Sequence, residues 1–192
     1  MHFDRALRTT LRNFSTFWLI VAAVTIPLNL AWAFLYQDVI ATQELHSDIQ
    51  ALPPGEEVRG VDGGAIESAD RARLIVLALE LALIPILERA TRRAIERDGS
   101  GRVPTALAAW RSVARASGPQ AAGPWRLSVV LVMAGFALVV WGLATLIGWL
   151  LAAPVPDSIA WLAVGLTRGG ALALALPFLL VGLVEARRPS EG

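Results

Sequence analysis

The chain has 192 residues, of which 55% are hydrophobic and 17% are charged, and it contains no cysteine. A soluble domain of this length does not have so apolar a composition, whereas a helical membrane protein does. The lack of cysteine excludes disulfides, iron–sulfur clusters, thiolate zinc sites and a cysteine nucleophile in this chain. Because the formal net charge is only +1, nucleic acid is not an expected partner.

The first element, residues 1–13, is predicted to be an amphipathic helix on the cytoplasmic membrane surface. On a helix its basic side chains share one face and its apolar side chains share the other: Arg5, Arg8 and Arg12 against Phe3, Leu7, Leu11 and Phe14. The alternative is a basic flank that only sets the orientation of the following span.

Residues 14–36 form the first predicted span, because this apolar run is long enough to cross a bilayer. A secretory signal is the alternative, with Ala31 and Ala33 in the pattern of a cleavage site. The apolar run is long and continues beyond that site, so a span that is kept is the favoured interpretation.

The acidic, Pro/Gly-rich residues 37–71 are predicted to be an extracytoplasmic loop that contains a short helix over residues 38–49. This loop contains Glu44, His46 and Asp48, the residues of the sequence that most resemble a set of metal ligands. They alternate as on a strand and lack further ligands, so no metal site is predicted.

The second predicted span, residues 72–88, has a short apolar core and contains Glu80. A helix buried among the others is therefore the alternative. A span is favoured because otherwise the acidic loop before it and the basic loop after it would lie on the same side of the membrane.

The helix of this second span should begin near Ser68 and continue past the membrane to Arg97. Two ion pairs at i,i+4 spacing are expected in the extension: Glu88 with Arg92, and Arg92 with Glu96. The run Asp98-Gly99-Ser100-Gly101 should end the helix.

Residues 89–126 are predicted to be a basic cytoplasmic loop with a second amphipathic helix, whose first turn holds Pro104. An apolar stripe opposes a polar face on it: Leu107, Trp110, Val113 and Ala114 against Arg111, Ser112 and Arg115. The candidate lipid-headgroup contacts of this loop are Arg89, Arg92, Arg93, Arg97, Trp110, Arg111 and Arg115. The alternative is that these arginines only set the topology.

Residues 127–153 and 158–184 are the third and fourth predicted spans. The extracytoplasmic turn between them, 154–157, is so short that the two must form an antiparallel hairpin, and 185–192 follow as a cytoplasmic tail. The predicted fold is thus an all-α polytopic membrane protein with four transmembrane helices and two short amphipathic interfacial helices. Because basic residues favour the cytoplasm, both termini are expected there, in a bacterial cytoplasmic membrane.

Three polar side chains are predicted at similar depth in the bundle: Asn29, Glu80 and Arg168. A charge inside a bilayer needs a partner or water, so Glu80 and Arg168 are expected to pair. One interpretation is a site for a solute or a proton; the other is an ion pair that fixes the register of the helices.

Small residues recur every four positions on the last two spans, and such faces allow close helix contact. They are Ala144, Gly148 and Ala152 on the third span, and Gly165, Gly169 and Ala173 on the fourth. The sequence leaves three partners open for these faces: another helix of the same chain, a second copy of the chain, or another membrane protein.

No reaction signature occurs in the chain: the sequence lacks GxSxG, HExxH, a Walker loop and a dinucleotide fingerprint. No catalytic, cofactor-binding or metal-binding residue is predicted. The expected function is that of a non-enzymatic membrane protein acting through lipid or protein contacts. The alternative is a small transporter or channel component, with a polar site at Asn29, Glu80 and Arg168.

Two stretches carry a resemblance to a known family: residues 6–14 (ALRTTLRNF), and residues 90–111, with ATRRAI, GRVPTAL and a final Trp-Arg pair. They resemble the membrane domain attached to some bacterial glycerophosphoryl diester phosphodiesterases and found in related stand-alone membrane proteins. The phosphodiesterase catalytic domain and its metal carboxylates have no counterpart in this sequence. The resemblance therefore implies a helical membrane module of undefined biochemical role and no enzyme activity.

Overall fold

The structure is a computed structural model that describes residues 2–37, 63–101, 103–115 and 127–187. The described residues form six helices, which confirms the prediction of an all-helical chain. They are α1 (His2–Arg12), α2 (Phe14–Leu35), α4 (Gly63–Gly99), α5 (Ala106–Arg115), α6 (Leu127–Ala152) and α7 (Asp157–Ala186). The short helix predicted over residues 38–49, and with it Glu44, His46 and Asp48, lies outside the described residues.

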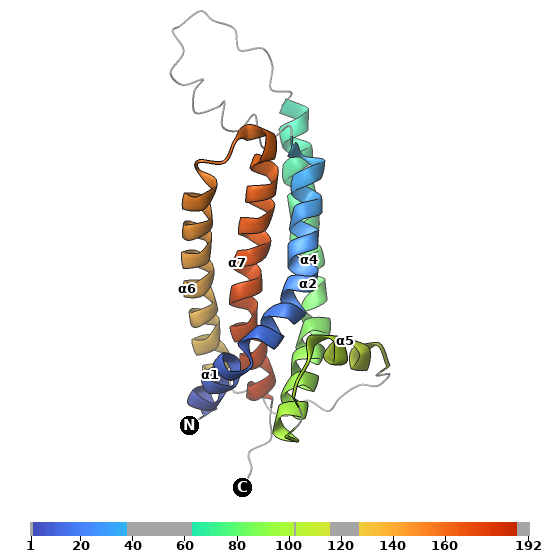
Figure 1. Cartoon of the computed structure of the whole chain (residues 1–192), viewed down its shortest axis with the longest axis vertical. Helices are drawn as coiled ribbons and strands as arrows, with labels where there is room; N and C mark the ends of the chain where they lie inside the picture. Colours follow the sequence, from blue (N-terminus) through green and yellow to red (C-terminus); the bar gives the residue numbers. More distant parts are fainter. Residues whose placement is uncertain (1, 38–62, 102, 116–126, 188–192) are drawn as a thin grey trace, which may run out of the picture.

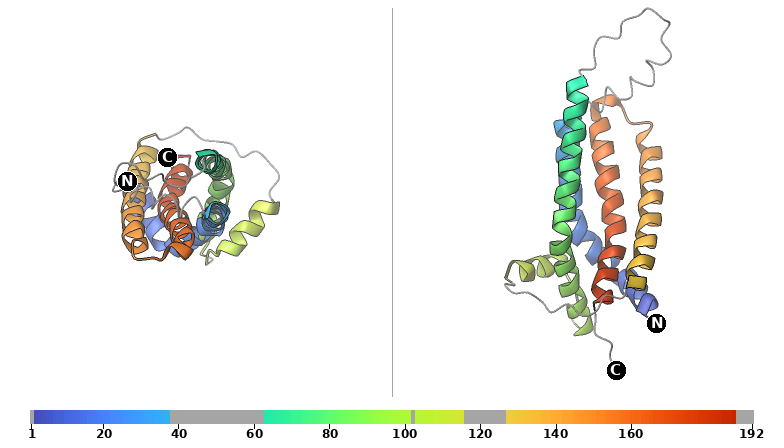
Figure 2. Two further views of the ribbon diagram at one scale, coloured as in Figure 1. Left: turned by 90° about the horizontal axis from the view of Figure 1, so that it is seen from above. Right: turned by 180° about the vertical axis from the view of Figure 1, so that it is seen from behind.

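Four long helices run along the bundle, and the two short helices α1 and α5 lie across one end of it (Figure 1). α7 is the central helix: it packs extensively on α6 and α2, and also on α4 and α1. Seen along the bundle, α7 lies between α6 on one side and the pair α2 and α4 on the other (Figure 2). We call the end that carries α1 and α5 the α5 end.

Three helices, α2, α6 and α7, are long and apolar enough to cross a membrane by length and composition, which marks the chain as a multi-pass membrane protein. α4 is the longest helix, with 37 residues, but charged residues interrupt every stretch of it that would be long enough to span. It is also not buried among the others, because Leu74 is 65% exposed and Ile75 and Leu81 are exposed beside it.

α4 begins at Gly63, earlier than the predicted Ser68, and ends at Gly99 as predicted. Gly101, just beyond it, has φ +74°, a conformation that glycine adopts without strain. α5 does not start on Pro104 as predicted. Its cap is Thr105, whose Oγ1 accepts a hydrogen bond from the Ala108 amide at 3.3 Å, so Pro104 precedes the helix.

The break between α1 and α2 is tied to the end of α4. Asn13 at the break donates a hydrogen bond to the Asp98 carboxylate at 3.0 Å, and Arg12 lies 3.4 Å from the same carboxylate. Thr16, in the first turn of α2, donates to the Pro104 carbonyl at 3.2 Å. These contacts hold the segment between α4 and α5 against the bundle and so position α5.

The predicted amphipathic character of the first helix agrees with its packing. Ala6 and Thr10 of α1 are fully buried, and the Phe3 ring lies 5.7 Å from the Phe136 ring of α6. Leu11 of the same apolar face is 60% exposed, and its contact with the membrane surface stays a prediction. The apolar face of α1 thus lies mainly against α7 and α6.

The small-residue faces of α6 and α7 are used for packing inside the chain. A Cβ added at Gly165 would meet Leu30 of α2, and one at Gly148 would meet the side chain of Thr167 on α7. Gly169 lies against the backbone of α2. Contact with a second copy through Ala144 stays a prediction.

Candidate functional site

The structure brings together two of the three predicted polar residues in the bundle. Asn29 of α2 is fully buried, and its Nδ2 donates to Glu80 Oε1 of α4 at 2.6 Å and to the Thr25 carbonyl at 2.8 Å. The sequence predicted equal depth for Asn29 and Glu80 within a turn or two, and this hydrogen bond agrees with it.

Arg168, the third predicted residue, does not form the expected ion pair with Glu80 among the described residues. Its guanidinium instead lies over the ring of Trp32, 4.7 Å from the ring centroid. The face of a tryptophan ring attracts a cation, and it offers one side of a planar guanidinium a partner that needs no opposite charge. Trp32 lies one helical turn beyond Asn29, so the described contact of Arg168 is with α2 and not with Glu80 of α4.

Glu80 and Arg168 nevertheless face one cavity of about 680 Å³ between α4, α6 and α7. Its walls come from three helices: Asp70, Arg73, Leu74, Leu77 and Glu80 of α4, Trp141, Thr145 and Trp149 of α6, and Arg168 and Leu172 of α7. Arg73 and the two tryptophans were not among the predicted site residues. The spacing of Arg73 and Glu80, seven residues apart on one helical face, could have indicated Arg73, whereas no local signal links the tryptophans of α6 to Glu80.

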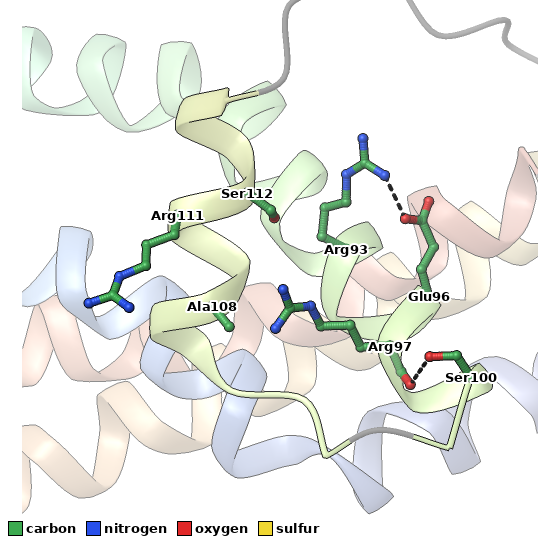
Figure 3. A pocket seen from close by; sticks show the side chains of 7 residues that line it. All are labelled: Arg93, Glu96, Arg97, Ser100, Ala108, Arg111 and Ser112. Carbon is green, nitrogen blue, oxygen red and sulfur yellow. Dashed lines mark hydrogen bonds and ion pairs between the residues drawn. The ribbon is translucent and has the colours of Figure 1, made fainter.

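A second pocket, of about 700 Å³, lies between α4 and α5 at the α5 end. Figure 3 shows the residues that line it: Arg93, Glu96, Arg97 and Ser100 of α4, and Ala108, Arg111 and Ser112 of α5. Arg93 pairs with Glu96 at 2.8 Å, and Arg97 extends from α4 toward Ala108. In the described part of the chain, Arg97 and Arg111 have no carboxylate partner.

α5 packs on α4 and α2 through a face next to the one that lines the pocket. Ala109 is fully buried, and Trp110 and Val113 pack partly against the core. Of the predicted stripe, Trp110 and Val113 pack against the bundle, whereas Leu107 is 61% exposed and its contact with the membrane interface stays a prediction. Trp110 packs against the buried cluster that includes Ala90 and Ala94 of α4, so its side chain lies toward the bundle.

Arg92, another predicted headgroup contact, already has a carboxylate partner within the chain. It pairs with Glu88 at 2.9 Å, as predicted, and Glu88 also pairs with Arg187 of the chain's last described turn at 2.7 Å. The predicted pair of Arg92 with Glu96 is wrong, since Glu96 pairs with Arg93 at i,i+3 spacing.

The predicted headgroup contacts thus divide into separate groups. Arg93, Arg97 and Arg111 gather at the α4–α5 pocket. Arg89 is exposed on α4 away from the lining of that pocket, and the side chain of Arg115 lies outside the described part of the chain.

No protein-family model, no curated protein and no solved structure matches this chain. The resemblance to the phosphodiesterase-linked membrane domain therefore stays a hypothesis, and the function has to be argued from the two sites.

Proposed function

We propose that this chain is a non-enzymatic integral membrane protein that binds the headgroup of an anionic lipid in the α4–α5 pocket. The observation that carries the proposal is three guanidinium groups around one pocket with a single carboxylate. Glu96 neutralises Arg93, which leaves the charges of Arg97 and Arg111 for a phosphate. Arginine is suited to this role because its planar fork of N–H donors matches two phosphate oxygens at once.

The position of the pocket supports a lipid as the source of the phosphate. α5 lies across the bundle where the apolar helices α2, α6 and α7 end (Figure 1), which is the level expected of lipid headgroups. Val103 is 82% exposed, and Leu107 is exposed beside the pocket. Apolar side chains next to a basic pocket are typical of a surface that dips into the headgroup region.

A test of the pocket is the double variant Arg97→Gln with Arg111→Gln, titrated with phosphatidylglycerol and followed by native mass spectrometry. A hydrogen bond to a charged group contributes about 1.5–3 kcal/mol, so the double variant is expected to bind this lipid at least about 10-fold more weakly. Arg89→Gln removes the same charge from α4 without touching the pocket lining and should change binding little.

Soluble glycerol phosphate distinguishes a lipid site from a site for a free phosphate compound. We expect it to compete poorly, because it lacks the acyl chains that Val103 and Leu107 would contact. Unchanged lipid binding by the double variant contradicts the proposal. Equal competition by glycerol phosphate reassigns the pocket to a soluble ligand.

α4 is proposed as the fourth span, with both termini in the cytoplasm. The support is its row of exposed leucines and the arginines at the α5 end, which the positive-inside bias assigns to the cytoplasm. Since the chain has no native cysteine, Ser100→Cys and Ser158→Cys report the two ends without further changes. A membrane-impermeant thiol reagent should label Ser158→Cys in intact cells and Ser100→Cys only in opened cells; the reverse pattern would overturn the orientation.

A transporter or channel component is the second candidate function. The observation that favours it is the cavity that joins Glu80 and Arg168, next to buried Asn29. The lining residues of that cavity lie from the middle of the helices toward the end away from α5, which weighs against a path through the bundle. Lipid binding is therefore the leading proposal.

A further inference from the structure

The cavity between α4, α6 and α7 is separate from the α4–α5 pocket and has a different chemistry. Four charged side chains line it, two of each sign: Asp70 and Glu80, and Arg73 and Arg168. The charges of the lining sum to zero, whereas the α4–α5 pocket has an excess of positive charge. A ligand of zero net charge that carries both signs would leave no uncompensated charge in the cavity.

These charged groups are incompletely satisfied within the described residues. Arg168 has the Trp32 ring against one face, but no hydrogen-bond acceptor for its N–H groups. Arg73 has no ion-pair partner there, and Glu80 accepts one hydrogen bond, from Asn29. Charged groups at membrane depth require partners, so an occupant should supply an acceptor to the arginines and a donor to Glu80.

Apart from Thr145, the rest of the cavity wall is apolar, and the cavity is open on the side between α4 and α6. α4 and α6 each pack on α7 without a substantial contact with each other among the described residues. Leu74 and Leu77 of α4 and Trp141 and Trp149 of α6 are exposed along this opening. Water would satisfy the charged groups but leave these side chains wet, whereas an acyl chain between α4 and α6 would cover them.

We propose that this cavity binds a zwitterionic aminophospholipid, with its phosphate on Arg73 and Arg168 and its primary ammonium on Glu80. A primary ammonium is required because Glu80 accepts hydrogen bonds, and a trimethylated ammonium has no N–H to donate. The tryptophans would hold a quaternary ammonium through their ring faces, so phosphatidylcholine is the sharpest competitor.

The test compares phosphatidylethanolamine, phosphatidylcholine and phosphatidylglycerol with identical acyl chains, by native mass spectrometry of the full chain. The Arg97→Gln, Arg111→Gln background is used so that the α4–α5 pocket contributes little. Phosphatidylethanolamine is expected to bind at least about 10-fold more tightly than phosphatidylcholine, the effect of one hydrogen bond to a charged group.

Two variants connect this selectivity to the cavity. Glu80→Gln still accepts the hydrogen bond from Asn29, but it gives the lining a net charge of one positive, so the preference should move to phosphatidylglycerol. Arg73→Gln, at an exposed position, gives the lining a net charge of one negative and should weaken all three lipids by about 10-fold or more, phosphatidylglycerol the most. Arg71→Gln is the matched control, because Arg71 pairs with Glu67 and does not line the cavity.

Equal binding of phosphatidylethanolamine and phosphatidylcholine would overturn this assignment, as would an unchanged preference in Glu80→Gln. A folded protein that binds none of the three lipids in this background would show that water alone fills the cavity. These results are independent of the proposed function, which is tested by phosphatidylglycerol binding to the wild-type chain and the Arg97→Gln, Arg111→Gln variant and by competition with glycerol phosphate.

Discussion

Gly169→Ala is expected to destabilise the bundle by about 3 kcal/mol, the upper end of the range for overpacking a tight interior. The added Cβ would lie 2.8 Å from the Ile26 Cα and 2.9 Å from the Thr25 carbonyl oxygen. Both are backbone atoms of α2, so no side-chain rotation can relieve the clash. Thr25 also donates a hydrogen bond to the Gly169 carbonyl at 3.1 Å, and separating the helices would lengthen it.

Gly170→Ala is the matched control, one position along the same helix. A Cβ there meets nothing within 4 Å, and alanine is favoured over glycine in a helix by about 0.5–1 kcal/mol. Gly170→Ala should therefore be neutral or slightly stabilising. Thermal unfolding in mild detergent measures both variants; equal midpoints for the two would show that α2 and α7 are not in close backbone contact.

The second large effect is expected at Glu88, the carboxylate that joins α4 to the end of α7. Glu88 is 7% exposed and lies 2.9 Å from Arg92 and 2.7 Å from Arg187. Glu88→Ala removes the shared partner of two guanidinium groups and leaves their like charges close together. Breaking such a buried pair costs about 3–5 kcal/mol, and we expect the lower end because both arginines are partly exposed.

Glu96→Ala is the control for this change, since it removes a carboxylate from the same helix two turns later. The Glu96–Arg93 pair is exposed at i,i+3 spacing, and such surface pairs contribute about 0–1 kcal/mol. Unfolding measured in low and high salt separates the two, because a buried pair is screened less than a surface pair. If Glu88→Ala and Glu96→Ala lose the same stability, Glu88 does not connect α4 to α7.

The sequence by itself determined the apolar helices and several of their ends. Long apolar runs predicted α2, α6 and α7, because a chain in a bilayer must satisfy its backbone hydrogen bonds within its own helices. The glycines at 99 and 101 predicted the end of α4 through their tolerance of a left-handed conformation. Glu88 and Arg92 were predictable as a pair because i,i+4 neighbours share a helix face.

Only the tertiary structure decided which faces of the helices contact each other. Periodicity groups the side chains of one helix, but the rotation of that helix and its neighbours follow from packing the whole bundle. Hence Arg168 lies on Trp32 instead of pairing with Glu80, and the stripe of α5 covers α4 and α2. The contact between Glu88 and Arg187, 99 residues apart, has no local signal in the sequence, because it exists only once α4 and α7 lie together.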